Sequence, residues 1–184
     1  MRRLRVKINM GERDHAVSWK VLFPSLLLLL GSLVSVRATE APLRDAIAAP
    51  GETIVLAVHA EGAQVYECKI GGDGKLAWAF REPIATLLVD GKTVGRHYAG
   101  PSWEHNDGSA VVGKVAASAP GATPGDIPWL KLDVVSHRGT GILSGVTTVQ
   151  RIDTQGGNLD GACDKAGAFR SVSYSAGYVF LRKG

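Results

Sequence analysis

Short runs of β-branched and aromatic residues, broken by glycine, proline, aspartate and asparagine, are the dominant pattern of the chain after residue 52. Apolar runs of this length between turn residues are typical of strands in antiparallel sheets. The pattern predicts nine strands, at residues 53–59, 64–70, 75–80, 86–89, 92–98, 109–116, 129–136, 145–153 and 173–181.

The residues between these runs favour tight turns and surface loops. Glycine- and aspartate-rich turns at 71–74 and 90–91 predict hairpins, and longer loops are expected at 118–128 and 154–168. No sustained amphipathic helix follows the start of the first strand, which disfavours parallel α/β folds. We therefore expect an all-β fold with little helix, either an antiparallel β-sandwich or a partly closed barrel of about nine short strands.

The N-terminus has the pattern of a secretory signal peptide: basic residues, an apolar run at 21–36, and a small residue, Ala38. The apolar run has 16 residues, fewer than the roughly 20 of a membrane-spanning helix. Cleavage after Ala38 is thus favoured over an uncleaved anchor. We expect a signal peptide at 1–38, a lead-in segment at 39–52 and a single β domain at 53–184. The protein is then exported, periplasmic or extracellular, and meets the membrane only transiently through its signal peptide.

The positive charge of the chain belongs to this leader. Residues 1–38 carry seven Lys and Arg against two acids, so removing them from a chain of net charge +4 leaves a domain near −1. The remaining basic residues are interspersed with acids rather than gathered. A nucleic-acid partner is not expected, because binding to phosphates needs a basic face.

The only two cysteines, Cys68 and Cys163, lie in the predicted domain. In an exported chain they can oxidise to a disulfide that closes a 95-residue loop, and two buried free thiols are the alternative. Cys-x-x-Cys and the usual zinc spacings do not occur, so no metal role is assigned to the cysteines. The glycine-rich stretch at 139–145 lacks the spacing of a dinucleotide-binding loop, and no cofactor is expected.

The richest concentration of reactive residue types lies at 97–109. It is expected to form a rim between two strands, with turns at 100–101 and 106–108. Its ligand-binding candidates are His97, Tyr98, Trp103, Glu104, His105 and Asp107. The two histidines and two acids among them could also hold a metal or act as general acid and base. The competing interpretation is that these residues only pack and turn the chain, so no catalytic residue is assigned.

Aromatic residues suggest a binding surface, because flat rings bury the C–H faces of sugars. Trp78 and Trp129 lie in apolar runs and are expected in the core, whereas Trp103 is expected to face a ligand. Binding of a carbohydrate or another small extracytoplasmic ligand is therefore the leading hypothesis. The alternatives are a metal-assisted or acid/base hydrolase that uses the same rim, and a structural or interaction protein of the cell envelope. An enzyme is the less favoured class.

Eight short motifs occur in order along the chain, at residues 64–68, 103–104, 107–109, 127–130, 150–152, 156–157, 163–164 and 174–180. With them the chain resembles the domain of unknown function 3455 family, DUF3455, exported proteins of bacteria and fungi. The resemblance implies that the cysteine pair and the block 97–109 coincide with recurrent positions of the family. Two departures are the absence of a proline at 158–162 and Gly177 where an acid is common.

Overall fold

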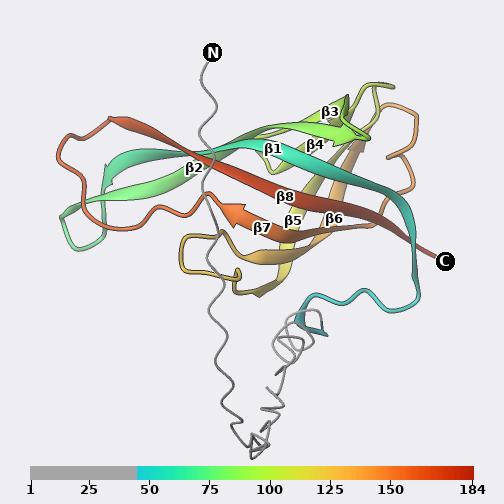
Figure 1. Ribbon diagram of the computed structural model, residues 1–184, viewed down its shortest axis with the longest axis horizontal. Helices are drawn as coiled ribbons and strands as arrows, with labels where there is room; N and C mark the ends of the chain where they lie inside the picture. The colour runs from blue at the N-terminus through green and yellow to red at the C-terminus, as the bar shows by residue number, and fades with distance from the viewer. Residues whose placement is uncertain (1–44) are drawn as a thin grey trace, which may run out of the picture. The chain divides into compact units, whose positions relative to one another are not determined.

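The computed structural model describes residues 45–184 (Figure 1). The predicted signal peptide and the first part of the lead-in segment lie outside these residues. In the described part, no helix has the length and apolar character needed to cross a membrane. The strands are β1 (Glu52–Ile70), β2 (Leu76–Val89), β3 (Lys92–Tyr98), β4 (Ser102–His105), β5 (Ala110–Ala119), β6 (Trp129–Arg138), β7 (Thr148–Gly156) and β8 (Phe169–Lys183).

These strands form one antiparallel sheet in which each strand pairs with its sequence neighbours and β1 pairs with β8, so the sheet closes into a barrel. The prediction of an all-β antiparallel fold with little helix is confirmed, and the sheet takes the barrel form. The hairpin turn predicted at residues 90–91 is present. Asp90 and Gly91 both have positive φ, of 48° and 73°, as a two-residue turn between twisted strands requires.

The strand boundaries differ from the expectation in two ways. The first four predicted strands are two long ones, because residues 60–63 and 81–85 continue the ladder between β1 and β2. Gly62 lies where β1 crosses closest to β2, and a Cβ there would collide with the Ile84 carbonyl oxygen. A glycine that suggests a break in the sequence is therefore a close approach inside a strand. The short strand β4 was not predicted, because Pro101 and the polar residues after it suggest a loop.

Side chains alternate between the barrel interior and its outer surface. On β1, Val58, Ala60 and Gln64 are buried, and on β8 Tyr178 and Phe180 are buried. The interior residues of the other strands join them in a single core cluster. This period of two is what a sheet with one buried face requires.

A smaller cluster lies on the outer wall of the barrel. Trp129 is 7% exposed and packs with Ile47 and Ala119. The segment that carries Ile47 is held by Gln150, whose Nε2 donates to the Ile47 carbonyl at 2.7 Å. Trp129 is thus buried beneath the chain that precedes β1. Trp78, also expected in the core, is only partly buried.

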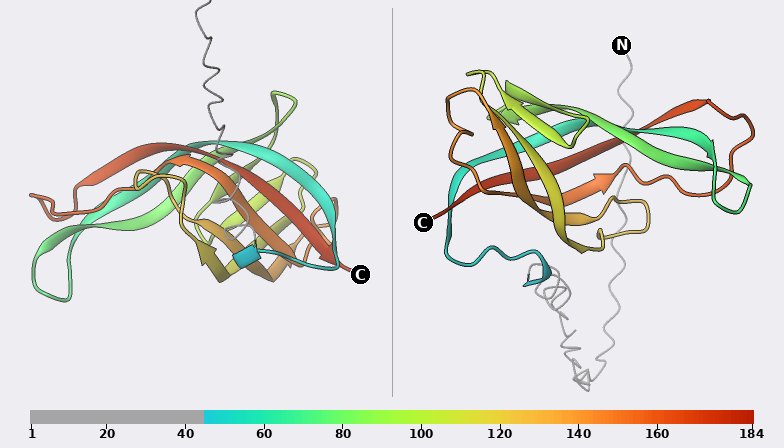
Figure 2. Two further views of the ribbon diagram at one scale, coloured as in Figure 1. Left: turned by 60° about the horizontal axis from the view of Figure 1, so that its bottom comes forward. Right: turned by 180° about the vertical axis from the view of Figure 1, so that it is seen from behind.

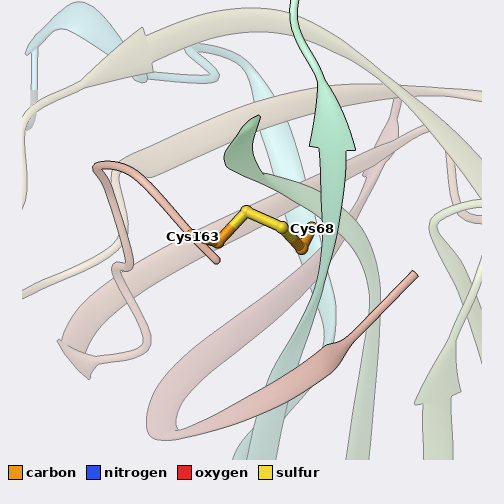
Figure 3. Close-up of a disulfide and its surroundings, with 2 residues drawn as sticks. All are labelled: Cys68 and Cys163. Carbon is orange, nitrogen blue, oxygen red and sulfur yellow. A yellow bond between two sulfur atoms is a disulfide. The ribbon is translucent and has the colours of Figure 1, made fainter. Parts of the chain in front are cut away.

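An arm extends from one end of the barrel (Figures 1 and 2). It consists of residues 65–70 of β1, 76–82 of β2, the loop 157–168 and the start of β8. The loop is joined to the strands by an isolated bridge between Ala77 and Ala162 and by a bond from the Cys68 amide to the Ala168 carbonyl. The Cys68–Cys163 disulfide fastens the same loop to β1, with Cα atoms 5.9 Å apart (Figure 3). The predicted disulfide is present.

We expect replacement of both cysteines, C68A together with C163A, to lower the free energy of unfolding by about 4 kcal/mol, because the crosslink restricts a long loop of the unfolded chain. Urea unfolding of the double variant and of the reduced wild type measures the loss, and the two should agree. A mass that does not rise by two hydrogens when the wild type is reduced would contradict the bond.

Candidate functional site

A cavity of about 460 Å³ lies in the lumen of the barrel, at the end from which the arm extends. We call it the lumen cavity. Each of the eight strands contributes at least one lining residue, and most of the lining is apolar. Gln64 and Tyr66 line it from β1 and Arg151 from β7, while Pro101 and Pro128 lie in the loops around it. A cavity of this size and character is typical of a small-molecule site.

An aromatic layer forms its inner wall. The His97 and Trp103 rings stack with centroids 4.5 Å apart and an interplanar angle of 10°. The Tyr178 ring packs against both, at 5.0 Å from His97 and 5.4 Å from Trp103. Phe180 makes an edge contact with Trp103 at 6.3 Å. This layer separates the lumen cavity from the rest of the core.

His97 is neutral in this layer. Its Nδ1 lies 2.8 Å from the Ser102 carbonyl oxygen, and because a carbonyl only accepts, Nδ1 carries the proton and Nε2 is left as an acceptor. Burial lowers the pKa of His97 to about 3, opposed by the bond to Ser102, with a smaller lowering from the charge on Arg151. The imidazole therefore has no charge at neutral pH.

Hydrogen-bond donors without partners lie around the same cavity. The Gln64 Nε2 and Trp103 Nε1 atoms are buried and have no partner among the described residues. The Tyr178 hydroxyl lies 3.4 Å from that of Tyr174, and burial raises the pKa of Tyr178, so this phenol keeps its proton. A buried donor without a partner costs about 1–3 kcal/mol. Such groups in a cavity are typical of positions where a ligand supplies the acceptor.

Hydrogen bonds fix the loops beside the cavity. The Tyr66 hydroxyl donates to the Gly157 carbonyl at 2.8 Å, and the Thr154 hydroxyl donates to the Ile127 carbonyl at 2.6 Å. Gly157 has φ of 86°, and a Cβ there would lie 2.8 Å from the Cβ of Tyr174. Glycine is thus needed for this loop to approach β8.

Two of the six ligand-binding candidates, His97 and Trp103, line the lumen cavity. Both point inward from adjacent strands, where they are paired in register. Trp103, expected on a polar rim, is only 1% exposed, because its position on β4 has the inward parity. The structure places Trp103 in the barrel interior and not on a rim, and its contact with a ligand stays a prediction.

Glu104 and Tyr98 face outward instead. The Glu104 carboxylate accepts from Arg96 at 3.1 Å, from Arg138 at 2.6 Å and from the Tyr98 hydroxyl at 3.1 Å. Ala110 lies in register between Glu104 and Arg138 on the intervening strand, and its small side chain leaves the ion pair a clear path. The hydrogen bonds from Arg96 and then Arg138 lower the pKa of Glu104. Its carboxylate is committed to joining β3, β4 and β6.

His105 is the last residue of β4, and Asp107 lies in the turn that follows. Asp107 accepts from the Ser109 hydroxyl at 2.6 Å and from the Ile142 amide at 2.8 Å, so it fastens the loop after β6. These bonds hold the pKa of Asp107 well below its usual range, the Ser109 hydroxyl having the largest effect. His105 Nδ1 lies 3.1 Å from the same carboxylate. Within residues 45–184, no group of three or more metal-ligating side chains gathers, and His97 faces the interior, away from Glu104.

Five of the eight motifs noted in the sequence contribute to the lumen cavity, through residues that include Gln64, Trp103, Ile127, Arg151 and Tyr178. A family model described as protein of unknown function (DUF3455) matches residues 49–182, the whole barrel apart from the ends of the chain. The chain belongs to the DUF3455 family. No curated protein and no solved structure matches it.

Sequence reasoning missed Gln64 and Arg151 as site residues of this DUF3455 domain. Both are polar residues at inward positions of strands, and both belong to motifs that carried the family resemblance. The signal that could have found them is the alternation of a strand, in which every second side chain points to the same face. Counting by two from the apolar Val58 and Ala60 on β1 reaches Gln64, and counting by two from Val149 on β7 reaches Arg151.

We expect the stability of the DUF3455 domain to depend on pH through His97. Its pKa is about 3 when folded and about 6.5 when unfolded, so the unfolded chain binds the extra proton. Stability is then present above pH 6.5 and is lost as pH falls toward 3, by up to about 1.4 kcal/mol per pH unit. Urea unfolding at several pH values should show a flatter profile for H97Q. The exposed histidine variant H59Q serves as the control and should keep the wild-type slope.

We expect W103A to lower the free energy of unfolding by about 3–5 kcal/mol, because removal of a buried indole leaves a void in the aromatic layer. W78A should cost clearly less, because Trp78 is only partly buried. Chemical denaturation of both variants provides the measurement. Equal losses for the two would contradict the central position of Trp103.

Proposed function

We propose that this protein binds a small ligand with a largely apolar body inside the lumen cavity. The observation that carries the proposal is a largely apolar cavity whose lining includes Gln64 and Trp103, two side chains with buried donors, Nε2 and Nε1, that have no partner among the described residues. An eight-stranded barrel has an interior just wide enough to be filled by side chains or to hold one small ligand. Here the aromatic layer fills part of the lumen, and the cavity occupies the end beside the arm.

The shape of the site favours an apolar body over a sugar ring. Sugar stacking needs an exposed aromatic face, whereas His97 covers one face of Trp103 and the indole is 1% exposed. Phe80 and Leu130 line the cavity together with the aromatic layer, and such walls are best matched by apolar surface. A carbohydrate, the ligand class first expected, is the competing outcome and is tested by a glycan array.

We further propose that the protein acts after export, in the periplasm or outside the cell. The disulfide supports this compartment, since such bonds persist in oxidising surroundings. The basic and apolar leader at residues 1–38 is the sequence feature that supports it. The ligand would then be one that the protein meets outside the cytoplasm.

The residues of the hydrolase hypothesis give it less support than the cavity gives to binding. The Glu104 carboxylate is neutralised by two arginines on the outer wall, and Asp107 fastens a loop. An envelope interaction role is supported by exposed apolar side chains of the arm, such as Ile70 and Phe169. The interaction role is the function expected if no small molecule binds in the lumen cavity.

We expect N-phenyl-1-naphthylamine, a neutral fluorescent reporter, to bind the purified protein and to bind V115W at least about tenfold more weakly, which corresponds to about 1.4 kcal/mol. Val115 lines the lumen cavity, so an indole there takes up the space of the reporter. V135W is the matched control, because Val135 is an exposed valine of the neighbouring strand that does not line the cavity.

Fluorescence titration measures all three proteins, and V135W should bind the reporter as the wild type does. If the reporter bound the apolar leader, V115W and V135W would have the same affinity for it, because the leader is identical in both. Equal affinity of V115W and V135W would show that the lumen is not the binding site.

A further inference from the structure

The charged residues that line the lumen cavity are of one sign. Two arginines, Arg81 and Arg151, line it, and no Asp or Glu is among the lining residues. A partly enclosed site with positive groups and no acid attracts an anion, and its apolar walls strengthen the attraction by lowering the local dielectric constant.

The two arginines differ in how they are satisfied. Arg81 pairs with Glu82 at 3.1 Å, and its guanidinium lies over the Phe169 ring at 4.9 Å. Arg151 has no carboxylate partner within residues 45–184. Its Nε donates to the Pro128 carbonyl at 3.0 Å, which fixes the plane of the guanidinium. The guanidinium also hydrogen-bonds the neutral Tyr178 hydroxyl, so neither acceptor neutralises its charge. Arg151 is therefore the cavity cation without a counter-ion.

The groups beside Arg151 are donors as well. Arg151 on β7 is paired in register with Tyr178 on β8, so the guanidinium and the phenol lie side by side on the cavity wall. Gln64 and Trp103 add the two buried N–H groups without partners. A carboxylate has two oxygens that accept about four hydrogen bonds, and a guanidinium binds it in a fork geometry. A neutral polyol also needs acceptors for its own hydroxyl donors, whereas a carboxylate uses the donors alone.

From this arrangement we propose that the ligand is a small organic anion, an apolar body that ends in one carboxylate held by Arg151 beside Tyr178. The proposal rests on the ligand-binding function proposed above and specifies its chemical class. The apolar body then lies against Leu130, Leu132 and Ile127, which also line the cavity.

The test uses displacement of N-phenyl-1-naphthylamine by two competitors of almost the same shape, trans-cinnamate and its neutral amide, cinnamamide. We expect cinnamate to displace the reporter from the wild type at a concentration at least about tenfold lower than cinnamamide, because a charge-assisted bond to a guanidinium is about twice as strong as a neutral one. R151Q should abolish this preference and R151K should retain part of it. The affinity of the reporter is measured separately for each variant, so that cinnamate and cinnamamide are compared at equal reporter occupancy.

R96Q is the matched control, because Arg96 is an arginine of the outer wall that pairs with Glu104, and it should keep the full preference for cinnamate. Equal displacement by cinnamate and cinnamamide in the wild type would overturn the proposal of an anionic ligand while leaving the binding function in place. Loss of reporter binding in R151Q would show that Arg151 shapes the cavity and does not select the charge. Absence of reporter binding to the wild type would count against the binding function itself.

Discussion

The pairing of β1 with β8 is the interaction on which the rest of the structure depends. It closes the sheet, so that every strand has two neighbours and one of its faces is enclosed. Closure gives each strand a partner on both sides along at least part of its length, which reduces the sheet edge that could pair with another chain. It also fixes which residues meet, because the inward side chains of all eight strands must share a single lumen.

The two ends of that lumen are used differently. Large rings of β3, β4 and β8 meet in one layer and exclude water from the core. Toward the arm, Gln64 and Arg151 occupy inward positions that would otherwise hold apolar side chains. Polar groups at such positions reduce stability unless something satisfies them. Sites that bind ligands commonly retain residues that are unfavourable for the empty protein.

The sequence allowed prediction of the fold class, the disulfide and the hairpin at residues 90–91. Each rests on local chemistry: short apolar runs between turn residues, the cysteine count, and a turn that needs positive φ. It did not reveal the continuity of β1, since the close approach at Gly62 is a contact between strands. Trp103 and Glu104 are adjacent in sequence but lie on opposite faces. Their separate roles follow only once β4 is recognised as a strand with a defined parity.

The position of the disulfide near the end of β1 shortens the covalent path between β1 and β8. Following the chain along β1 to Cys68, across the sulfur bond to Cys163 and through residues 164–168 leads directly into β8. Along this covalent path, β1 and β8 form a hairpin whose turn is the disulfide itself. The pair that closes the barrel, the most distant in sequence, thereby becomes a local one, and the disulfide-bonded chain pays less loop-closure entropy to form that seam.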